Sequence, residues 1–97
     1  MSTRTLSPPT FDVNARWQLH DQVEIRPERF GALLYHFGTR RLSFVKSPQL
    51  LSVLESLNNA SSAQDALTRA RVPEADQPTY VRALETLAGS TMICPAS

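Results

Sequence analysis

The sequence has few of the residues that build disulfides, metal centres or catalytic sites. It contains one cysteine, Cys94, and two histidines, His20 and His36, among 97 residues. A single cysteine excludes an internal disulfide, and neither histidine has a second ligand at metal-binding spacing. The Gly-rich phosphate loop and the Gly-x-Ser-x-Gly and His-Glu-x-x-His motifs are all missing. An enzyme is therefore the least favoured class, and we expect neither a cofactor nor a metal.

The sequence also lacks an excess of one charge and a long apolar run. Ten basic residues oppose nine acidic ones, for a formal net charge of +1. This balance provides no broad positive field for nucleic acid or anionic lipid. No apolar run is long enough to cross a bilayer, and the first residues lack the apolar core of a signal peptide. We therefore expect a single cytoplasmic domain with a modest core.

The first part of the chain divides into an arm and a strand. Two prolines in Ser7-Pro8-Pro9-Thr10 indicate a flexible N-terminal arm over residues 1–15, before a domain over residues 16–94. Apolar and polar residues alternate over residues 16–26, which predicts a first strand that is bent or broken near Asp21. Residues 27–31 are predicted to form a loop, because Pro27 cannot donate to a strand ladder.

A β-hairpin follows the loop. Residues 32–37 are rich in aromatic and apolar side chains, Gly38-Thr39 supplies a turn, and the alternation over Arg41–Val45 indicates the returning strand. The pleat places Leu42 and Phe44 on one face of that strand, and we expect the next helix to cover this face. Short connections make the three strands an antiparallel meander, with one strand of the hairpin at a sheet edge.

Three helices are predicted after residue 46, where the apolar period changes from two to about 3.6. Ser47-Pro48 begins the first helix, which ends near Asn58-Asn59, and overlapping capping patterns at Ser61 and Ser62 begin the second. The third runs from Asp76 to Gly89, and its apolar face consists of Tyr80, Val81, Leu84, Leu87 and Ala88. Residues 91–93 form a short apolar tail. The predicted fold class is α+β and winged-helix-like: a three-stranded antiparallel β-meander followed by a three-helix bundle.

The residues alone leave two binding functions open. The second and third helices have the order and length of a helix-turn-helix, so a small winged-helix DNA-binding regulator is one alternative. The third helix, however, offers Arg82 for DNA with acidic residues on either side. The other function is capture of an extended peptide by the backbone of an edge strand over Arg41–Val45. The structural alternative is an edge strand that Arg41 and Lys46 protect from pairing and that binds no partner.

A resemblance to a known family favours the peptide. Residues 26–57, RPERFGALLYHFGTRRLSFVKSPQLLSVLESL, resemble the signature region of the mycofactocin biosynthesis chaperones, and GALLYHFGTRRLSF is the most distinctive part. These chaperones belong to the PqqD-like group of precursor-peptide recognition (RRE) domains. The resemblance implies a non-catalytic protein without a cofactor. Such a protein binds the leader of the precursor peptide MftA and delivers it to the radical SAM maturase MftC.

The resemblance also implies a site. In this group the leader lies as an added strand along the third strand, which corresponds to Arg41, Leu42, Ser43, Phe44 and Val45. The helix wall of the cleft corresponds to Tyr80, Ala83, Leu84 and Leu87, although Tyr80, Leu84 and Leu87 also fit core positions. If the Ser43 amide faces the peptide, Ser43→Pro abolishes binding. A subunit that only stabilises the maturase is a further alternative.

Overall fold

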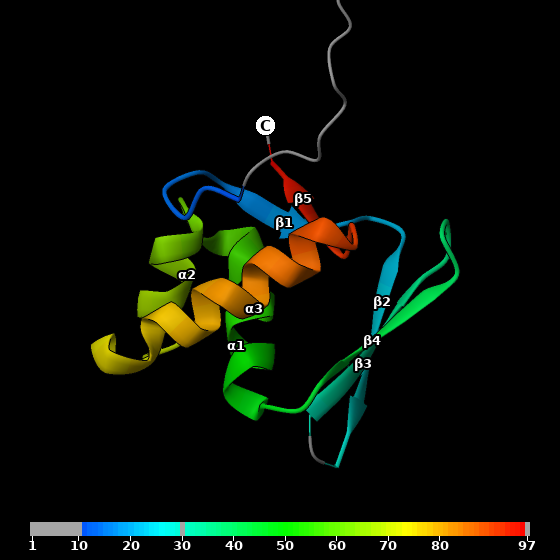
Figure 1. The fold of residues 1–97 in the computed structure, drawn as a ribbon, viewed down its shortest axis with the longest axis horizontal. Coiled ribbons are helices and arrows are strands. Elements are labelled where there is room, and N and C mark those ends of the chain that lie inside the picture. The colour runs from blue at the N-terminus through cyan, green and yellow to red at the C-terminus, as the bar shows by residue number, and fades with distance from the viewer. Residues whose placement is uncertain (1–10, 30, 97) are drawn as a thin grey trace, which may run out of the picture.

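The computed structural model describes residues 11–29 and 31–96, and the first ten residues of the predicted arm lie outside this part. Helices gather on one side of the molecule, and a three-stranded sheet extends on the other (Figure 1). The elements in chain order are β1 (Trp17–Leu19), β2 (Val23–Glu28), β3 (Gly31–His36), β4 (Arg41–Val45), α1 (Pro48–Ser56), η1 (Leu57–Asn59), α2 (Ala63–Arg69), η2 (Glu74–Asp76), α3 (Gln77–Gly89) and β5 (Ile93–Pro95). Within the described ranges, no helix has the length and apolar character needed to cross a membrane.

The predicted α+β fold with an antiparallel meander is confirmed. The sheet has the order β2-β3-β4, and both neighbouring pairs are antiparallel. The predicted loop over residues 27–31 is too long at both ends, because β2 continues through Pro27, opposite Ala32, to Glu28, and β3 begins at Gly31. Pro27 is tolerated because β2 is an edge strand on which a missing donor can face away from the ladder.

The predicted first strand is in fact two strands in two sheets. The break falls near Asp21, as expected, where the Val23 N–H donates to the His20 carbonyl at 2.9 Å. β1 leaves the meander and pairs antiparallel with β5, with Gln18 opposite Cys94. The apolar tail after α3 therefore forms a strand. The β1–β5 ribbon joins the two ends of the described chain above the helices (Figure 1).

The hairpin buries the face opposite to the one we predicted. Val45 is 1% exposed, whereas Leu42 and Phe44 are 60% and 56% exposed. The reason lies in the pairing with β3. Val45 lies opposite the fully buried Ala32, and α1 packs against both strands on that face. Alternation within β4 defines two faces, but the apolar partners on β3 and the position of α1 decide which face is covered.

The helix starts predicted from capping residues are confirmed. Ser47 Oγ accepts a hydrogen bond from the Leu50 N–H at 3.1 Å, and Ser62 Oγ accepts one from the Asp65 N–H at 3.0 Å. Asp65 in turn accepts from the Ser61 N–H at 3.0 Å and from Arg69 Nε at 2.9 Å. The hydrogen bond from Arg69, followed by the one from Ser61, lowers the pKa of the Asp65 carboxyl from its ordinary value.

The core lies between the helices and the inner face of the sheet. Leu54, Leu67 and Leu84 come from the three α-helices and are fully buried. Trp17 from β1 packs into the same core at 3% exposure and contacts Phe11, with the ring centroids 4.8 Å apart. Residues 11–15, which we assigned to the arm, also hydrogen-bond to the start of α2. The described end of the arm therefore lies against the domain.

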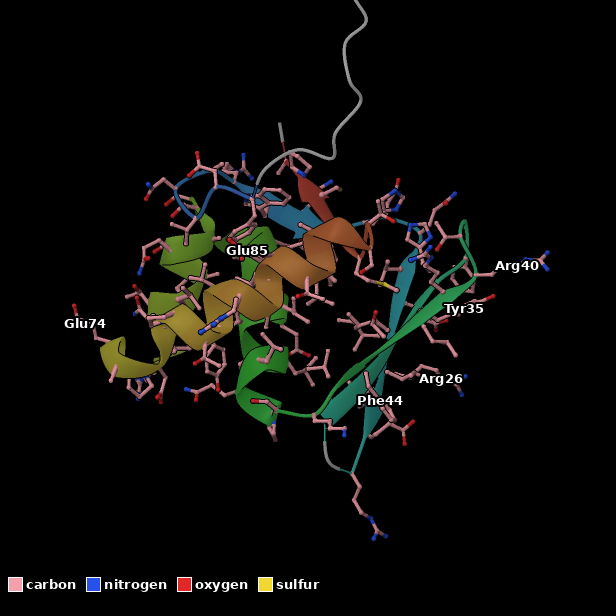
Figure 2. The ribbon with its side chains drawn as sticks, in the orientation of Figure 1. Arg26, Tyr35, Arg40, Phe44, Glu74 and Glu85 are labelled. Atoms are coloured by element: carbon pink, nitrogen blue, oxygen red, sulfur yellow. The ribbon has the colours of Figure 1, made fainter. Side chains whose placement is uncertain are left out.

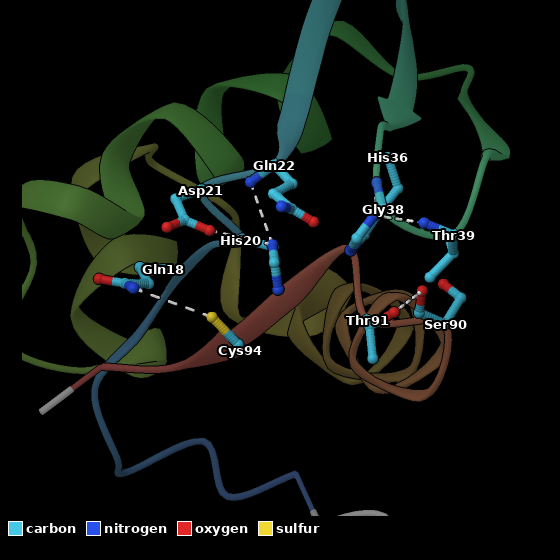
Figure 3. Close-up of polar contacts among 10 residues, drawn as sticks. All are labelled: Gln18, His20, Asp21, Gln22, His36, Gly38, Thr39, Ser90, Thr91 and Cys94. Atoms are coloured by element: carbon cyan, nitrogen blue, oxygen red, sulfur yellow. Dashed lines mark hydrogen bonds and ion pairs between the residues drawn. The ribbon is translucent and has the colours of Figure 1, made fainter.

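His36 of β3 is a buried polar residue. It is 3% exposed, and its Nδ1 accepts hydrogen bonds from the Gly38 and Thr39 N–H groups at 3.0 and 3.1 Å (Figure 3). Its ring packs on the ring of His20, with centroids 4.4 Å apart. Both turn amides are thus satisfied by one side chain, which fixes the turn that leads into β4.

Two glycines provide a matched test of this geometry. Gly31 has φ of +151°, and a Cβ there would overlap the Val45 carbonyl oxygen, while a Cβ on Gly89 would meet nothing within 4 Å. We expect Gly31→Ala to lower the free energy of unfolding by at least about 2 kcal/mol. Gly89→Ala should raise it by roughly 0.5–1 kcal/mol. Urea unfolding followed by circular dichroism measures both, and equal effects would contradict the close approach of β3 and β4.

Candidate functional site

The backbone hydrogen bonds of the sheet show which groups of β4 face β3 and which face away from it. The Phe37 N–H donates to the Gln22 carbonyl at 2.8 Å, on the β2 side, while the His36 carbonyl accepts from the Arg40 N–H at 2.7 Å, on the β4 side. Because backbone groups alternate in direction along an antiparallel strand, Leu34 of β3 faces β4 and pairs with Ser43. The backbone groups of Leu42 and Phe44 therefore point away from β3. Within the described ranges no further strand lies beside β4.

The opposite edge of the sheet is less suited to pairing. By the same alternation, the residues of β2 with outward backbone groups are Val23, Ile25 and Pro27. The Val23 N–H already donates to His20, and Pro27 has no N–H to offer. Proline at an outward position is a common protection of an edge strand. β4, by contrast, carries no proline.

A groove of two adjoining hollows lies beside β4. One hollow of about 200 Å³ is lined by the last two residues of β4, Leu50 of α1, and Ala83, Thr86 and Leu87 of α3. A second hollow of about 160 Å³ shares Leu50 and Ala83 with the first and continues toward Ser47, Thr79 and Tyr80. The groove therefore runs from the Phe44–Val45 end of β4 along α3. It does not reach the Arg41 end of the strand.

Hydrogen bonds hold Tyr80 at one end of this groove. Its hydroxyl donates to Gln49 Oε1 at 3.2 Å and lies 3.4 Å from Ser47 Oγ. Gln49 is itself held, because its Nε2 donates to the carbonyls of Ala70 and Arg71 at 3.3 and 3.1 Å. The side chain of Tyr80 is thus a fixed wall, connected to the start of α1 and to the end of α2.

Most of the predicted site residues come together at this edge and groove. Arg41, Leu42, Ser43, Phe44 and Val45 form β4. Three of the four α3 residues, Tyr80, Ala83 and Leu87, line the groove. Leu84 does not, because it is fully buried on the core side of α3. The Ser43 amide faces β3, so the condition attached to the predicted effect of Ser43→Pro is not met, and the outward donor is the amide of Leu42.

Sequence reasoning did not include Ser47, Leu50, Thr79 and Thr86 among the site residues. Leu50 belongs to the apolar repeat of α1 and is typical of a core residue, but in the first turn it is half-buried. Thr79 and Thr86 flank Ala83 by about one helical turn each, and this spacing is the signal that identifies them once the α3 wall is known.

The remaining surfaces offer little for metal or DNA chemistry. Within the described ranges, no group of three His, Cys, Asp or Glu side chains could hold a metal ion. The outer face of η2 and α3 is lined by Glu74, Gln77, Pro78, Val81, Arg82 and Glu85, and Figure 2 shows the two glutamates on it. One arginine beside two carboxylates is a poor match for phosphates or base edges.

An open strand edge beside a groove of small hollows is a typical arrangement for binding an extended peptide. Comparison with known proteins agrees with this class. Residues 16–94 match the model of the "Peptide chaperone MftB family". The chain therefore belongs to the peptide chaperone MftB family, and the predicted resemblance is confirmed. Membership of a family of peptide chaperones also confirms the prediction that the chain is not an enzyme.

Individual relatives support this assignment over most of the chain. Peptide chaperone MftB of Mycolicibacterium smegmatis is 46% identical over 97 residues, which cover all of this chain and 95% of that protein. The proteins of the same name from Mycobacterium tuberculosis and Mycobacterium ulcerans are 49% and 48% identical over 85 residues, 88% of this chain and 78% of each relative. No solved structure matches the chain.

Amide hydrogen exchange in the free protein tests which amides of β4 face β3. We expect the Ser43 amide, which lies in the ladder with β3, to exchange at least about tenfold more slowly than the outward Leu42 amide. Leu34, on the facing strand, serves as a second protected reference. Exchange followed by NMR measures all three rates. Fast exchange at Ser43 with protection at Leu42 would show that the amide of Leu42, and not that of Ser43, lies in the ladder with β3.

Proposed function

We propose that this chain binds the leader of the precursor peptide MftA as an added strand along β4 and delivers it to the radical SAM maturase MftC. The observation that carries the proposal is the open side of β4, at the edge of the sheet and beside a groove formed with α3. Family membership supports a peptide as the ligand. The chemistry on the peptide belongs to the maturase, and we expect the chaperone to act in the cytoplasm, where the precursor peptide is made.

The backbone of β4 explains how such a site binds without a deep pocket. An added strand exchanges hydrogen bonds with the outward groups of β4, and each bond contributes about 0.5–1.5 kcal/mol. Several such bonds provide affinity that depends little on the peptide's sequence. This mode of binding also suits a domain of 97 residues with a modest core, because a strand added at the surface needs no large cavity.

The groove supplies selectivity on the inner side of the added strand. Its hollows of about 200 and 160 Å³ are smaller than the roughly 300–1,000 Å³ typical of pockets for small molecules. They match individual side chains that project from every second residue of a strand. The apolar lining by Leu50, Ala83 and Leu87 favours apolar side chains at these positions.

The first test separates the backbone of β4 from its side chains. Leu42→Pro removes the outward N–H and places a ring where the peptide would lie, so we expect leader affinity to fall at least about tenfold. Leu42→Ala keeps the N–H and should retain measurable binding. Calorimetry with the isolated leader peptide measures both variants.

Two controls make this result decisive. Ser43→Pro removes a donor within the protein's own ladder and should unfold the hairpin, while Leu42→Pro should keep the wild-type circular dichroism spectrum. Equal affinity of folded Leu42→Pro and the wild type would refute binding along β4. A wild-type chain that binds the maturase but not the isolated leader would instead support a merely stabilising subunit.

The second test fills the groove. Ala83→Phe inserts a ring at the residue shared by both hollows, and we expect leader affinity to fall about tenfold or more because the inner side chains of the peptide lose their space. Glu85→Phe adds the same ring on the outer face of α3 and should change affinity by less than about twofold. Fluorescence anisotropy of a labelled leader provides the measurement. Equal effects of the two variants would exclude α3 as a wall of the site.

A further inference from the structure

Two large apolar side chains of β4 lie on the face of the sheet opposite to the one that α1 packs against. Leu42 is 60% exposed and Phe44 is 56% exposed. Their neighbours on β3 are Tyr35, opposite Leu42, and Leu33, opposite Phe44, and both are half-buried. Figure 2 shows Tyr35 and Phe44 on the side of the sheet turned away from the helices. These four residues, Leu33, Tyr35, Leu42 and Phe44, form what we term the outer strip.

The outer face of the sheet changes from charged at β2 to apolar at β4. One cross-strand row runs from Glu24 through Tyr35 to Leu42, and the other runs from Arg26 through Leu33 to Phe44. Each row begins with a charged residue on β2, at the far edge, and becomes apolar toward β4. The apolar end of both rows therefore coincides with the edge that is open to a further strand. Exposed apolar side chains gathered at one edge mark a contact surface.

The residues that end these rows are also the residues whose backbone faces outward. In an antiparallel pair, residues that exchange hydrogen bonds lie directly opposite each other, and their side chains point to the same face. A strand bonded antiparallel to β4 therefore has two residues opposite Leu42 and Phe44, two positions apart, with their side chains on the outer face. Such cross-strand neighbours lie about 4.5–5.5 Å apart at Cβ.

We infer that the bound peptide is recognised on both faces of the sheet. Two apolar side chains at positions i and i+2 of the peptide extend the rows and cover Leu42 and Phe44. The residues between and beside them project toward the groove along α3. This inference rests on the proposed function and specifies its ligand: a segment that is apolar at adjacent positions rather than only at every second one.

Substitutions in the outer strip test the inference. Leu42→Thr and Phe44→Thr keep the backbone donors and a β-branched residue suited to a strand, but remove the large apolar side chains. We expect leader affinity to fall about two- to fivefold for each variant and roughly tenfold for both together, in line with the usual strength of cross-strand pairs. The control is Val81→Thr, which makes the same kind of apolar-to-threonine change on the outer face of α3, away from β4, and should leave affinity within about twofold.

A complementary test uses the peptide. Aspartate is substituted at each position of the leader in turn, and the affinity of each variant is measured. We expect substitutions at consecutive positions of the bound segment each to weaken binding. Sensitivity at every second position alone would show that only the groove selects side chains, and would overturn the inference.

The outcomes separate this inference from the proposed function. If Leu42→Pro abolishes leader binding while the double threonine variant binds like the wild type, the added strand stands and recognition on the outer face is wrong. If neither change affects binding, the proposed function itself fails. If the double variant binds the leader normally but no longer binds the maturase, the outer strip is a maturase contact, which also overturns the inference.

Discussion

The candidate site depends on which residues of β4 direct their backbone hydrogen-bonding groups toward β3. Once His36 and Leu34 direct their backbone groups toward β4, the pairing partners Arg41, Ser43 and Val45 face inward, and Leu42 and Phe44 face outward. A shift by one residue would exchange these sets and would also move Val45 out of the core. The same pairing therefore decides which backbone groups face away from β3, which side chains are buried and which are exposed.

Two local features hold this pairing in place. The close approach of Gly31 to the Val45 carbonyl fixes one end of the hairpin, and a larger residue would not fit there. At the other end, the buried His36 side chain accepts hydrogen bonds from two turn amides. Between these points the ladder has little freedom to slip, so the outward side of β4 has a fixed geometry, as the proposed addition of a ligand strand requires.

The helices complete the site without enclosing it. α1 covers the inner face of the hairpin, while α3 leaves one small hollow against the end of β4 and a second against the start of α1. Hydrogen bonds connect Tyr80 of α3 to Gln49 and Ser47 at the start of α1. They hold this part of α3 in place as the wall of the groove. The proposed binding of an extended chain therefore takes place at the surface, while the core stays closed.

The sequence by itself determined the elements with strong local signals. Capping serines set the helix starts, the apolar period of the helices identified their buried faces, and alternation over Arg41–Val45 identified a strand with two distinct faces. The predicted edge strand over Arg41–Val45 rests on this alternation, whereas the α3 residues Tyr80, Ala83 and Leu87, which also line the candidate site, were implied by the family resemblance. The capping, periodic and alternating patterns depend on residues close together in the chain.

The tertiary structure alone decided which face of β4 is buried, which amides point outward, and that the first predicted strand divides between two sheets. Each depends on a partner distant in sequence. β5 draws β1 away from the meander, the register with β3 sets which amides of β4 face outward, and α1 covers Val45 rather than Leu42 and Phe44. Alternation within one strand is symmetric between its two faces and its two edges, so only packing against the rest of the chain can break that symmetry.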